Sequence, residues 1–160
     1  MTERATTHVS TLPADRTTAA FTVRALFGRP VHGVVPVRTA SVETDGDGRP
    51  LRVAAELDLG RIETGNAQRD RDLRKPGLLD LDRCPTLTFR STGVTATDDG
   101  WCVTGELTRG TTVAPVTLTV TRRDDTFVAE GALDRRALAV RAPRFLIGHD
   151  LSITVTAPAE

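Results

Sequence analysis

Aromatic side chains are scarce in this 160-residue sequence, which has no tyrosine, one tryptophan (Trp101) and five phenylalanines. Proteins that bind single-stranded nucleic acid stack the bases on such rings, so a stacking platform is not expected here. Charge of one sign is not in excess either, because 21 basic residues balance 21 acidic ones. Without a net field to attract phosphates, nucleic acid is not an expected partner.

Cysteine is rare too, with Cys84 and Cys102 as the full complement. If residues 85–92 and 101–109 pair as a hairpin, the two thiols are separated by on the order of a dozen residues, which at about 3.3 Å per residue exceeds the reach of a disulfide. We therefore expect two free thiols, as is usual for a cytoplasmic protein.

Long hydrophobic runs are absent. Residues 1–16, MTERATTHVSTLPADR, lack the apolar core of a secretion signal. Elsewhere no stretch approaches the roughly 20 apolar residues of a membrane-spanning helix. We expect a cytoplasmic protein with no integral membrane association, consisting of a flexible polar tail over residues 1–16 and one β-barrel domain over residues 17–160.

Histidine is sparse, and the spacing of His8, His32 and His149 matches no metal-ligand pattern. The sequence also lacks a G-x-S-x-G nucleophile elbow and a glycine-rich loop followed by a helix and a lysine. We expect no metal, no cofactor and no acyl-enzyme chemistry.

What the sequence does contain is period-two alternation of apolar and polar residues, which predicts β-strands. Val116, Leu118 and Val120, for example, alternate with threonines, as in a strand with one exposed face. This pattern predicts about eight strands, near residues 21–25, 31–42, 52–59, 85–92, 101–109, 116–121, 127–133 and 151–155.

A polar excursion separates the third and fourth of these strands. Residues Ala67 to Arg74 suit two helical turns with Asn66 as the N-cap, and a leucine patch follows at Leu78, Leu79 and Leu81. Antiparallel strands with one apolar face are best closed into a barrel, because closure removes exposed edges. The predicted fold is all-β: a closed antiparallel eight-stranded barrel with one short helical excursion between strands.

The apolar face of these strands forms the candidate interior. Its members either line a cavity or fill a solid core, since an eight-stranded barrel permits both. Small residues on the same faces, such as Ala55, Ala129 and Gly131, favour a cavity. The candidate ligand-binding residues are Phe21, Val23, Val35, Leu57, Leu87, Phe89, Val103, Leu107, Leu118, Phe127, Phe145 and Ile153.

Carboxylates recur on the opposite face of the strands, at Glu56, Asp58, Glu106 and Glu130. We interpret this face as the solvent face, because the alternate positions are consistently apolar. If it faced inward instead, a buried carboxylate with a raised pKa would be an acid/base candidate.

The excursion also carries a cluster of charges, Arg69, Asp70, Arg71, Asp72 and Arg74. Arginine forks bind carboxylate and phosphate groups, so this cluster is a candidate site for an anionic head group. The structural alternative, which we favour, is that Arg69 and Asp70 pair with backbone groups and hold the excursion against the barrel rim.

The order of motifs resembles that of the YceI-like proteins over some 135 residues. The matching positions are Phe21-Thr22-Val23, Gly33, Thr64, Asn66, Arg69, Asp70, Leu73, Arg74, Asp80, Pro85 to Phe89, Ser91, Gly105, Leu107, Thr108, Gly110, Thr112, Arg135 or Arg136, and Ile147-Gly148. This resemblance implies an elongated lipocalin-like barrel whose apolar tunnel holds a polyisoprenoid or fatty-acyl chain without altering it.

The sequence departs from the family pattern at several positions. Asp72 stands where the family usually has histidine, and Leu78, Leu79 and Val34 stand where aromatic residues are usual. Many relatives also carry a secretion signal. We expect the fold to survive these changes and the ligand to be shorter than, or different from, that of the relatives.

The function that we predict is non-covalent binding of an apolar small molecule by a monomer or homodimer. Arg69, Arg74 and His149 are the candidate head-group residues. An enzyme that cyclises or isomerises an apolar metabolite is the alternative, favoured by a carboxylate, histidine or arginine inside the cavity. A rigid interaction scaffold would follow from an interior packed solid.

Overall fold

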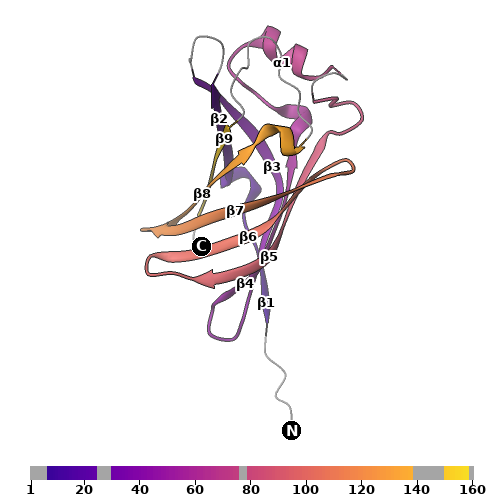
Figure 1. Cartoon of the computed structure of the whole chain (residues 1–160). Helices are drawn as coiled ribbons and strands as arrows, with labels where there is room; N and C mark the ends of the chain where they lie inside the picture. Colours follow the sequence, from indigo (N-terminus) through magenta and orange to yellow (C-terminus); the bar gives the residue numbers. More distant parts are fainter. Residues whose placement is uncertain (1–6, 25–29, 76–78, 139–149, 159–160) are drawn as a thin grey trace.

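The computed structural model describes residues 7–24, 30–75, 79–138 and 150–158 (Figure 1). Within these residues the chain forms nine strands, one α-helix and three short 3₁₀ turns. The elements are β1 (His8–Thr11), η1 (Ala14–Arg16), β2 (Thr18–Arg24), β3 (Pro30–Thr44), β4 (Pro50–Asp58), η3 (Leu59–Arg61), α1 (Ala67–Leu73), β5 (Thr86–Ala96), β6 (Gly100–Arg109), β7 (Thr112–Arg123), β8 (Thr126–Asp134), η4 (Arg135–Leu138) and β9 (Asp150–Pro158).

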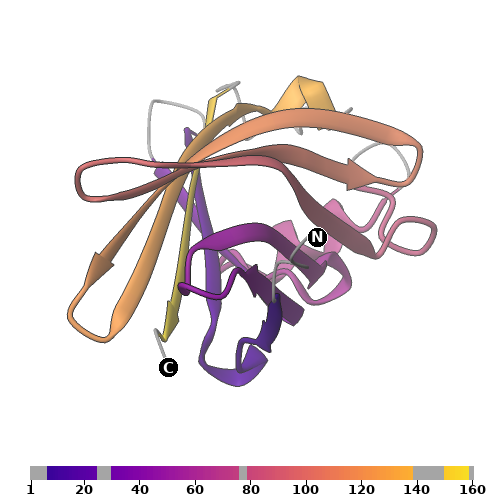
Figure 2. The ribbon, with the colours of Figure 1, turned by 90° about the horizontal axis from the view of Figure 1, so that it is seen from below.

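Strands β2 to β9 form a closed antiparallel barrel of eight strands, which confirms the predicted fold class. The order runs β3-β2-β9-β8-β7-β6-β5-β4, and a β3–β4 pairing closes the sheet on itself. Seen from below, the strands encircle a common axis (Figure 2). Helix α1, η3 and the β2–β3 end of the sheet lie together at one end of the barrel, which we call the α1 end (Figure 1).

Strand β1 lies within the segment that we predicted as a tail. It pairs antiparallel with β3, from His8 opposite Thr44 to Thr11 opposite Ser41. The amide of Leu12 then donates to the carbonyl of Ala40 at 2.8 Å. Regular structure therefore begins before residue 17, because backbone pairing along the edge of β3 does not require an apolar sequence.

A bulge in β3 changes which of its side chains face inward. Val37 lies opposite Leu57, and Thr39 lies opposite Glu56. Two steps along β3 therefore match one step along β4, and Arg38 is the extra residue. Before the bulge, odd-numbered residues are buried, and after it Ala40 takes the interior position. Without the bulge, period-two geometry would turn Glu43 into the barrel. Instead its carboxylate lies 3.2 Å from the guanidinium of Arg52.

Two phenylalanine rings lie over glycines of a neighbouring strand. Phe21 is directly opposite Gly33, and a Cβ at Gly33 would lie 2.2 Å from the ring of Phe21. The ring of Phe89 lies diagonally over Gly105 of the neighbouring strand, with a ring atom 2.6 Å from the position of the missing Cβ. The bare glycines allow both rings to lie close to the barrel wall, as in the aromatic rescue of strand glycines.

The predicted helix is confirmed as α1 (Ala67–Leu73), with Arg74 as its C-cap. The side chain of Asn66 accepts a hydrogen bond from the amide of Arg69 at 2.9 Å, so Asn66 is the N-cap as expected. Leu73, Leu79 and Leu81 are buried beneath this excursion. Leu78 lies outside the described residues.

The strand carboxylates face away from the interior, as expected. Arg38 lies 2.7 Å from Glu56 and 3.4 Å from Asp58 on the outer surface, and its hydrogen bond to Glu56 raises the pKa of Arg38. Glu106 and Glu130 are exposed.

Both cysteines are free, and Cys102 lies opposite Thr95 in the β5–β6 hairpin. In the part of the chain that the structure describes, no helix has the length and hydrophobicity needed to cross a membrane.

The contact between Phe21 and Gly33 leads to a first prediction. Gly33→Ala should force the Phe21 ring away from the wall and lower the free energy of unfolding by roughly 1–3 kcal/mol, the usual effect of overpacking. Urea unfolding measures this change. In the Phe21→Leu background, where the ring is gone, the same substitution should cost less; an equal cost in both backgrounds would contradict the proposed contact.

Candidate functional site

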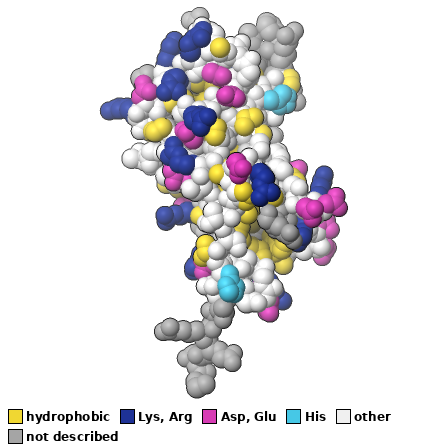
Figure 3. All heavy atoms as spheres, turned by 180° about the vertical axis from the view of Figure 1, so that it is seen from behind, with side chains coloured by type: hydrophobic (Ala, Val, Ile, Leu, Met, Phe, Trp, Pro, Cys, Tyr) yellow, Lys and Arg dark blue, Asp and Glu magenta, His cyan; other side chains and the backbone are white. Residues whose placement is uncertain are grey.

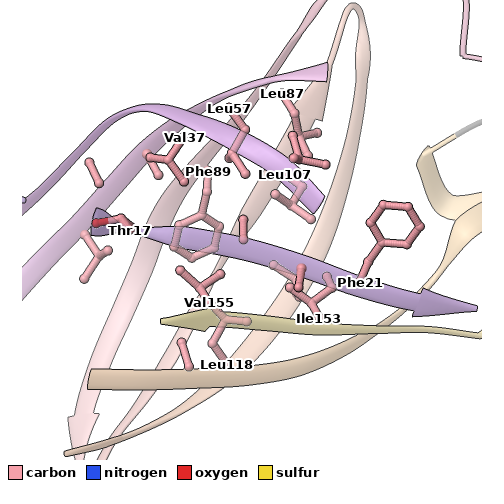
Figure 4. Close-up of a pocket in the computed structure, with 18 of the residues that line it drawn as sticks. Thr17, Phe21, Val37, Leu57, Leu87, Phe89, Leu107, Leu118, Ile153 and Val155 are labelled. Atoms are coloured by element: carbon pink, nitrogen blue, oxygen red, sulfur yellow. The ribbon is translucent and has the colours of Figure 1, made fainter. Parts of the chain in front are cut away.

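The barrel contains a cavity of about 550 Å³. Its lining comes from all eight barrel strands and is mainly aliphatic. Figure 4 shows side chains of these strands converging on this space, including Phe21, Phe89 and Ile153. The interior is therefore not packed solid. The hypothesis of a rigid interaction scaffold required a solid interior, so the structure does not support it. The volume lies within the range typical of small-molecule sites.

Eleven of the twelve residues predicted to bind a ligand line this cavity. They are Phe21, Val23, Val35, Leu57, Leu87, Phe89, Val103, Leu107, Leu118, Phe127 and Ile153. The twelfth, Phe145, lies outside the described residues. Strict alternation explains the agreement, because each strand sends every second side chain toward the barrel axis.

The end of the cavity opposite α1 is lined by Trp101, Phe127 and Arg122. The two rings meet edge to face, with centroids 5.9 Å apart and an interplanar angle of 67°. The guanidinium carbon of Arg122 lies 5.8 Å from the centroid of the Phe127 ring. On the reverse face of the molecule, hydrophobic side chains gather in a hollow toward its lower part (Figure 3).

Four of the eight serine, threonine and arginine residues in the described lining belong to the α1 end of the cavity. Thr64, Arg69, Arg109 and Arg135 all contribute to the lining there. Thr64, Arg109 and Arg135 are buried, with 6%, 9% and 6% of their surface exposed. The two ends therefore differ: one presents two aromatic rings and one arginine, and the other presents three arginines among leucines.

Arg69 and Asp70 have the structural role that we favoured. Asp70 accepts hydrogen bonds from the amide of Thr64 at 3.0 Å and from its hydroxyl. Arg69 donates through Nε to the hydroxyl of Thr64 at 2.8 Å and through Nη2 to its carbonyl at 2.7 Å. Together these bonds hold the start of α1 against the segment that follows η3. Arg69 also lines the cavity, so its structural role leaves it beside the interior.

Arg74 does not lie where a head-group residue should. Its guanidinium donates to the carbonyl of Gly60 at 2.9 Å and lies 3.4 Å from the carboxylate of Asp82. It is exposed and is not among the residues that line the cavity. As the C-cap of α1 it points to the outer side of the excursion, a direction that sequence spacing does not reveal. His149, the third predicted head-group residue, lies outside the described residues.

Arg109 and Arg135 are the residues that sequence reasoning missed. Arg109 donates through Nε to the carbonyl of Leu138 at 3.1 Å and through Nη1 to that of Leu79 at 2.8 Å. A signal for Arg109 was present, because it continues the inward series Trp101, Val103, Gly105, Leu107 of strand β6. For Arg135 no strand period applies, since it belongs to the turn η4.

Two of the three described departures from the family pattern, Val34 and Asp72, lie away from the cavity. Val34 is 44% exposed on the outer surface, so the missing aromatic ring there does not change the interior. Asp72 pairs with Lys75 at 3.1 Å. Of the four departing residues, Leu79 alone is among the described residues that line the cavity.

The described lining residues include four arginines and no aspartate, glutamate, histidine or lysine. The described residues also bring together no metal-binding group of three or more histidine, cysteine, aspartate or glutamate side chains. A guanidinium keeps its proton at all physiological pH values, so it attracts anions but does not exchange protons.

A closed eight-stranded barrel with an apolar interior cavity and a short helical cap belongs to the class of β-barrels that enclose small molecules. The family model of the YceI-like domain matches residues 11–159. The chain therefore belongs to the YceI-like family, as its motif order predicted.

Solved structures share this fold. The crystal structure of BcnA from Burkholderia cenocepacia matches with a TM-score of 0.74 and 18% identity, over 93% of this chain and 99% of that chain. A polyisoprenoid binding domain from Saccharophagus degradans matches with a TM-score of 0.65 and 13% identity, over 96% of this chain and 100% of that one.

Curated relatives match over a shorter stretch. A UPF0312 protein of Pseudomonas aeruginosa (strain LESB58) is 36% identical over 67 residues, which is 42% of this chain and 35% of that protein. A UPF0312 protein of Yersinia pestis (strain Pestoides F) has the same identity and coverage. The matched segment spans about a third of the length of these relatives.

The network around Thr64 leads to a second prediction. Thr64→Val keeps the shape of the side chain but removes the hydroxyl through which Thr64 bonds to the half-buried Arg69 and Asp70, so each of them loses one hydrogen bond. The free energy of unfolding should fall by about 1–3 kcal/mol. Urea unfolding gives the value, and Thr117→Val, an exposed threonine of β7, is the matched control. Equal stability of both variants would show that the network does not stabilise the excursion.

Proposed function

We propose that this protein binds one elongated apolar molecule, such as an isoprenoid or a fatty-acyl lipid, inside its barrel. The observation that carries this proposal is the cavity itself, about 550 Å³ of space with a mainly aliphatic lining. A preformed apolar site that excludes water favours hydrocarbon over any polar metabolite. The residues proposed to contact the ligand are the eleven predicted residues that line the cavity.

The driving force is removal of hydrocarbon from water. Each buried methylene contributes about 0.8 kcal/mol, so a long chain gains affinity from many small increments. Every barrel strand is hydrogen-bonded to a neighbour on each side, and the ligand therefore binds a site that is already ordered. Little binding energy is spent on ordering the protein.

The structural neighbour from Saccharophagus degradans is described as a polyisoprenoid binding domain. This description supports an isoprenoid as one ligand class for the same architecture. The cavity of this chain is lined by few rings, with Phe21, Phe89, Trp101 and Phe127 as the aromatic residues among the described lining. Its aliphatic walls suit a flexible chain.

The chemistry of the lining supports binding more than turnover. Acid-base catalysis of a cyclisation or isomerisation needs a side chain that gives or takes a proton. Arginine is the ionisable residue type among the described lining residues. We expected an arginine inside the cavity to favour an enzyme, but a guanidinium keeps its proton and does not act as an acid or a base. These arginines are therefore better suited to holding an anion in place, which is a binding role.

The proposal predicts a regular dependence of affinity on chain length. Each added methylene in a series of fatty acids should lower the Kd roughly fourfold, the equivalent of about 0.8 kcal/mol, until the cavity is full. Trp101 reports binding directly, because it lines the cavity and the chain has no other tryptophan and no tyrosine. Two results together would contradict the proposal: Trp101 fluorescence that does not change with any fatty acid of the series, and native mass spectra in which no ligand-bound protein is detected.

A pair of substitutions on β8 locates the binding site. Ala129 lines the cavity, whereas Ala132 on the same strand is exposed. Ala129→Phe should fill part of the cavity and weaken binding of the longest bound fatty acid at least tenfold. Ala132→Phe should leave its Kd unchanged. Equal effects of the two substitutions would place the ligand outside the barrel.

A further inference from the structure

The charge inside the barrel is one-sided. Four arginines contribute to the described lining and no carboxylate does, although the whole chain is electrically balanced. Three of the four, Arg69, Arg109 and Arg135, belong to the α1 end, and Arg122 belongs to the opposite end. The positive charge is therefore concentrated at one end of an otherwise apolar space.

Contacts between segments bring the three arginines to the same end. Arg109 binds the carbonyls of Leu79 and Leu138 and so joins the segment after α1 to the turn η4. The amide of Leu79 in turn donates to the carbonyl of Leu73 at 3.0 Å. Arg69 lies one helical turn before Leu73, and Arg135 lies in the same turn as Leu138.

Arg69 and Arg109 each donate to neutral acceptors. The carbonyls bound by Arg109, and the hydroxyl and carbonyl of Thr64 bound by Arg69, satisfy N–H groups without cancelling charge. The three internal segments outside the described residues, 25–29, 76–78 and 139–149, contain no aspartate or glutamate in their sequence.

Two carboxylates near these arginines in sequence, Asp70 and Asp134, accept hydrogen bonds from neighbouring groups. Asp70 accepts from the amide and hydroxyl of Thr64. Asp134 accepts from the amide and the guanidinium of Arg136, and this contact raises the pKa of Arg136. Neither carboxylate is among the residues that line the cavity.

We propose that the ligand carries an anionic head group, a carboxylate or a phosphate, that lies at the α1 end beside Arg69, Arg109 and Arg135. Its apolar chain then extends along the barrel toward Trp101. This inference rests on the proposed function and adds the charge and the direction of the ligand. Buried cations in a medium of low dielectric constant attract an anion strongly, and the planar fork of arginine matches both oxyanions.

The first test compares ligands that differ only in the head group: hexadecanoate, monohexadecyl phosphate, hexadecanol and hexadecylamine, each titrated below its micelle concentration. We expect at least one of the two anions to bind tenfold or more tightly than the alcohol, and the amine to bind most weakly. The anion that binds more tightly identifies the head-group chemistry.

The same series separates this inference from the proposed function. If all four ligands bind with equal Kd, or the amine binds best, the barrel binds apolar chains but the anionic head group is wrong. If none of them binds, the proposed function fails. The comparison uses the unmodified protein, so it does not depend on the folding of any variant.

Neighbouring arginines of η4 provide a matched pair of variants. Arg135 is buried and lines the cavity, whereas Arg136 is exposed and pairs with Asp134 at 2.7 Å. Arg135→Gln should reduce the preference for the anion over hexadecanol at least fivefold, and Arg136→Gln should leave it unchanged. Arg122→Gln tests the opposite end. Loss of the preference in that variant, with Arg135→Gln unaffected, would overturn the proposed direction.

Quenching of Trp101 by spin-labelled stearate measures the direction independently. Trp101 and Arg109 are eight residues apart on β6, which at about 3.3 Å per residue is roughly 26 Å. A nitroxide at carbon 16, near the end of the chain, should therefore quench Trp101 more strongly than one at carbon 5, near the carboxylate. Stronger quenching by the label at carbon 5 would contradict this orientation.

Discussion

Closure of the sheet is the constraint on which the rest of this structure depends. Because β3 pairs with both β2 and β4, every barrel strand has a neighbour on each side and sends alternate side chains toward a common axis. The interior is therefore specified residue by residue along the whole length of the barrel. The bulge at Arg38 shows how strict this requirement is, since one added residue keeps Ala40 and Val42 inside and the carboxylate of Glu43 outside.

Space inside the barrel arises where a large side chain on one strand lies over a glycine of the neighbouring strand. The rings of Phe21 and Phe89 lie over Gly33 and Gly105, and the side chain of Leu118 lies over Gly131 in the same way. Large residues thus cover the bare backbone of the wall and leave the axis unoccupied. A barrel of the same strand number with medium-sized residues at every interior position would be filled instead.

The two ends of the cavity have different chemistry, and this difference gives the site its direction. Trp101 and Phe127 line one end together with a single arginine, Arg122. Three arginines, Arg69, Arg109 and Arg135, line the other end, which is capped by the excursion that contains α1. Leu73 and Leu79 close that end with aliphatic surface, so the guanidinium groups act in surroundings of low dielectric constant. An elongated amphiphile with one anionic end complements this gradient.

Much of this arrangement was predictable from local pattern. Alternation alone identified the strands and eleven described residues of the cavity lining, because side-chain direction in a strand depends only on parity. The N-cap role of Asn66 and the outward direction of Glu106 follow from similarly local rules. The order of motifs identified the family. All these features depend on residues that are close together in the sequence.

Other features required the assembled chain. Strand β1 exists because the edge of β3 offers backbone partners, and Arg74 faces outward because of the way α1 ends against Gly60. Whether the interior is hollow depends on contacts such as Phe21 with Gly33, which join strands through the register of the sheet. Arg109 and Arg135 meet the same cavity only through closure, since long-range pairing brings together side chains that no local period relates.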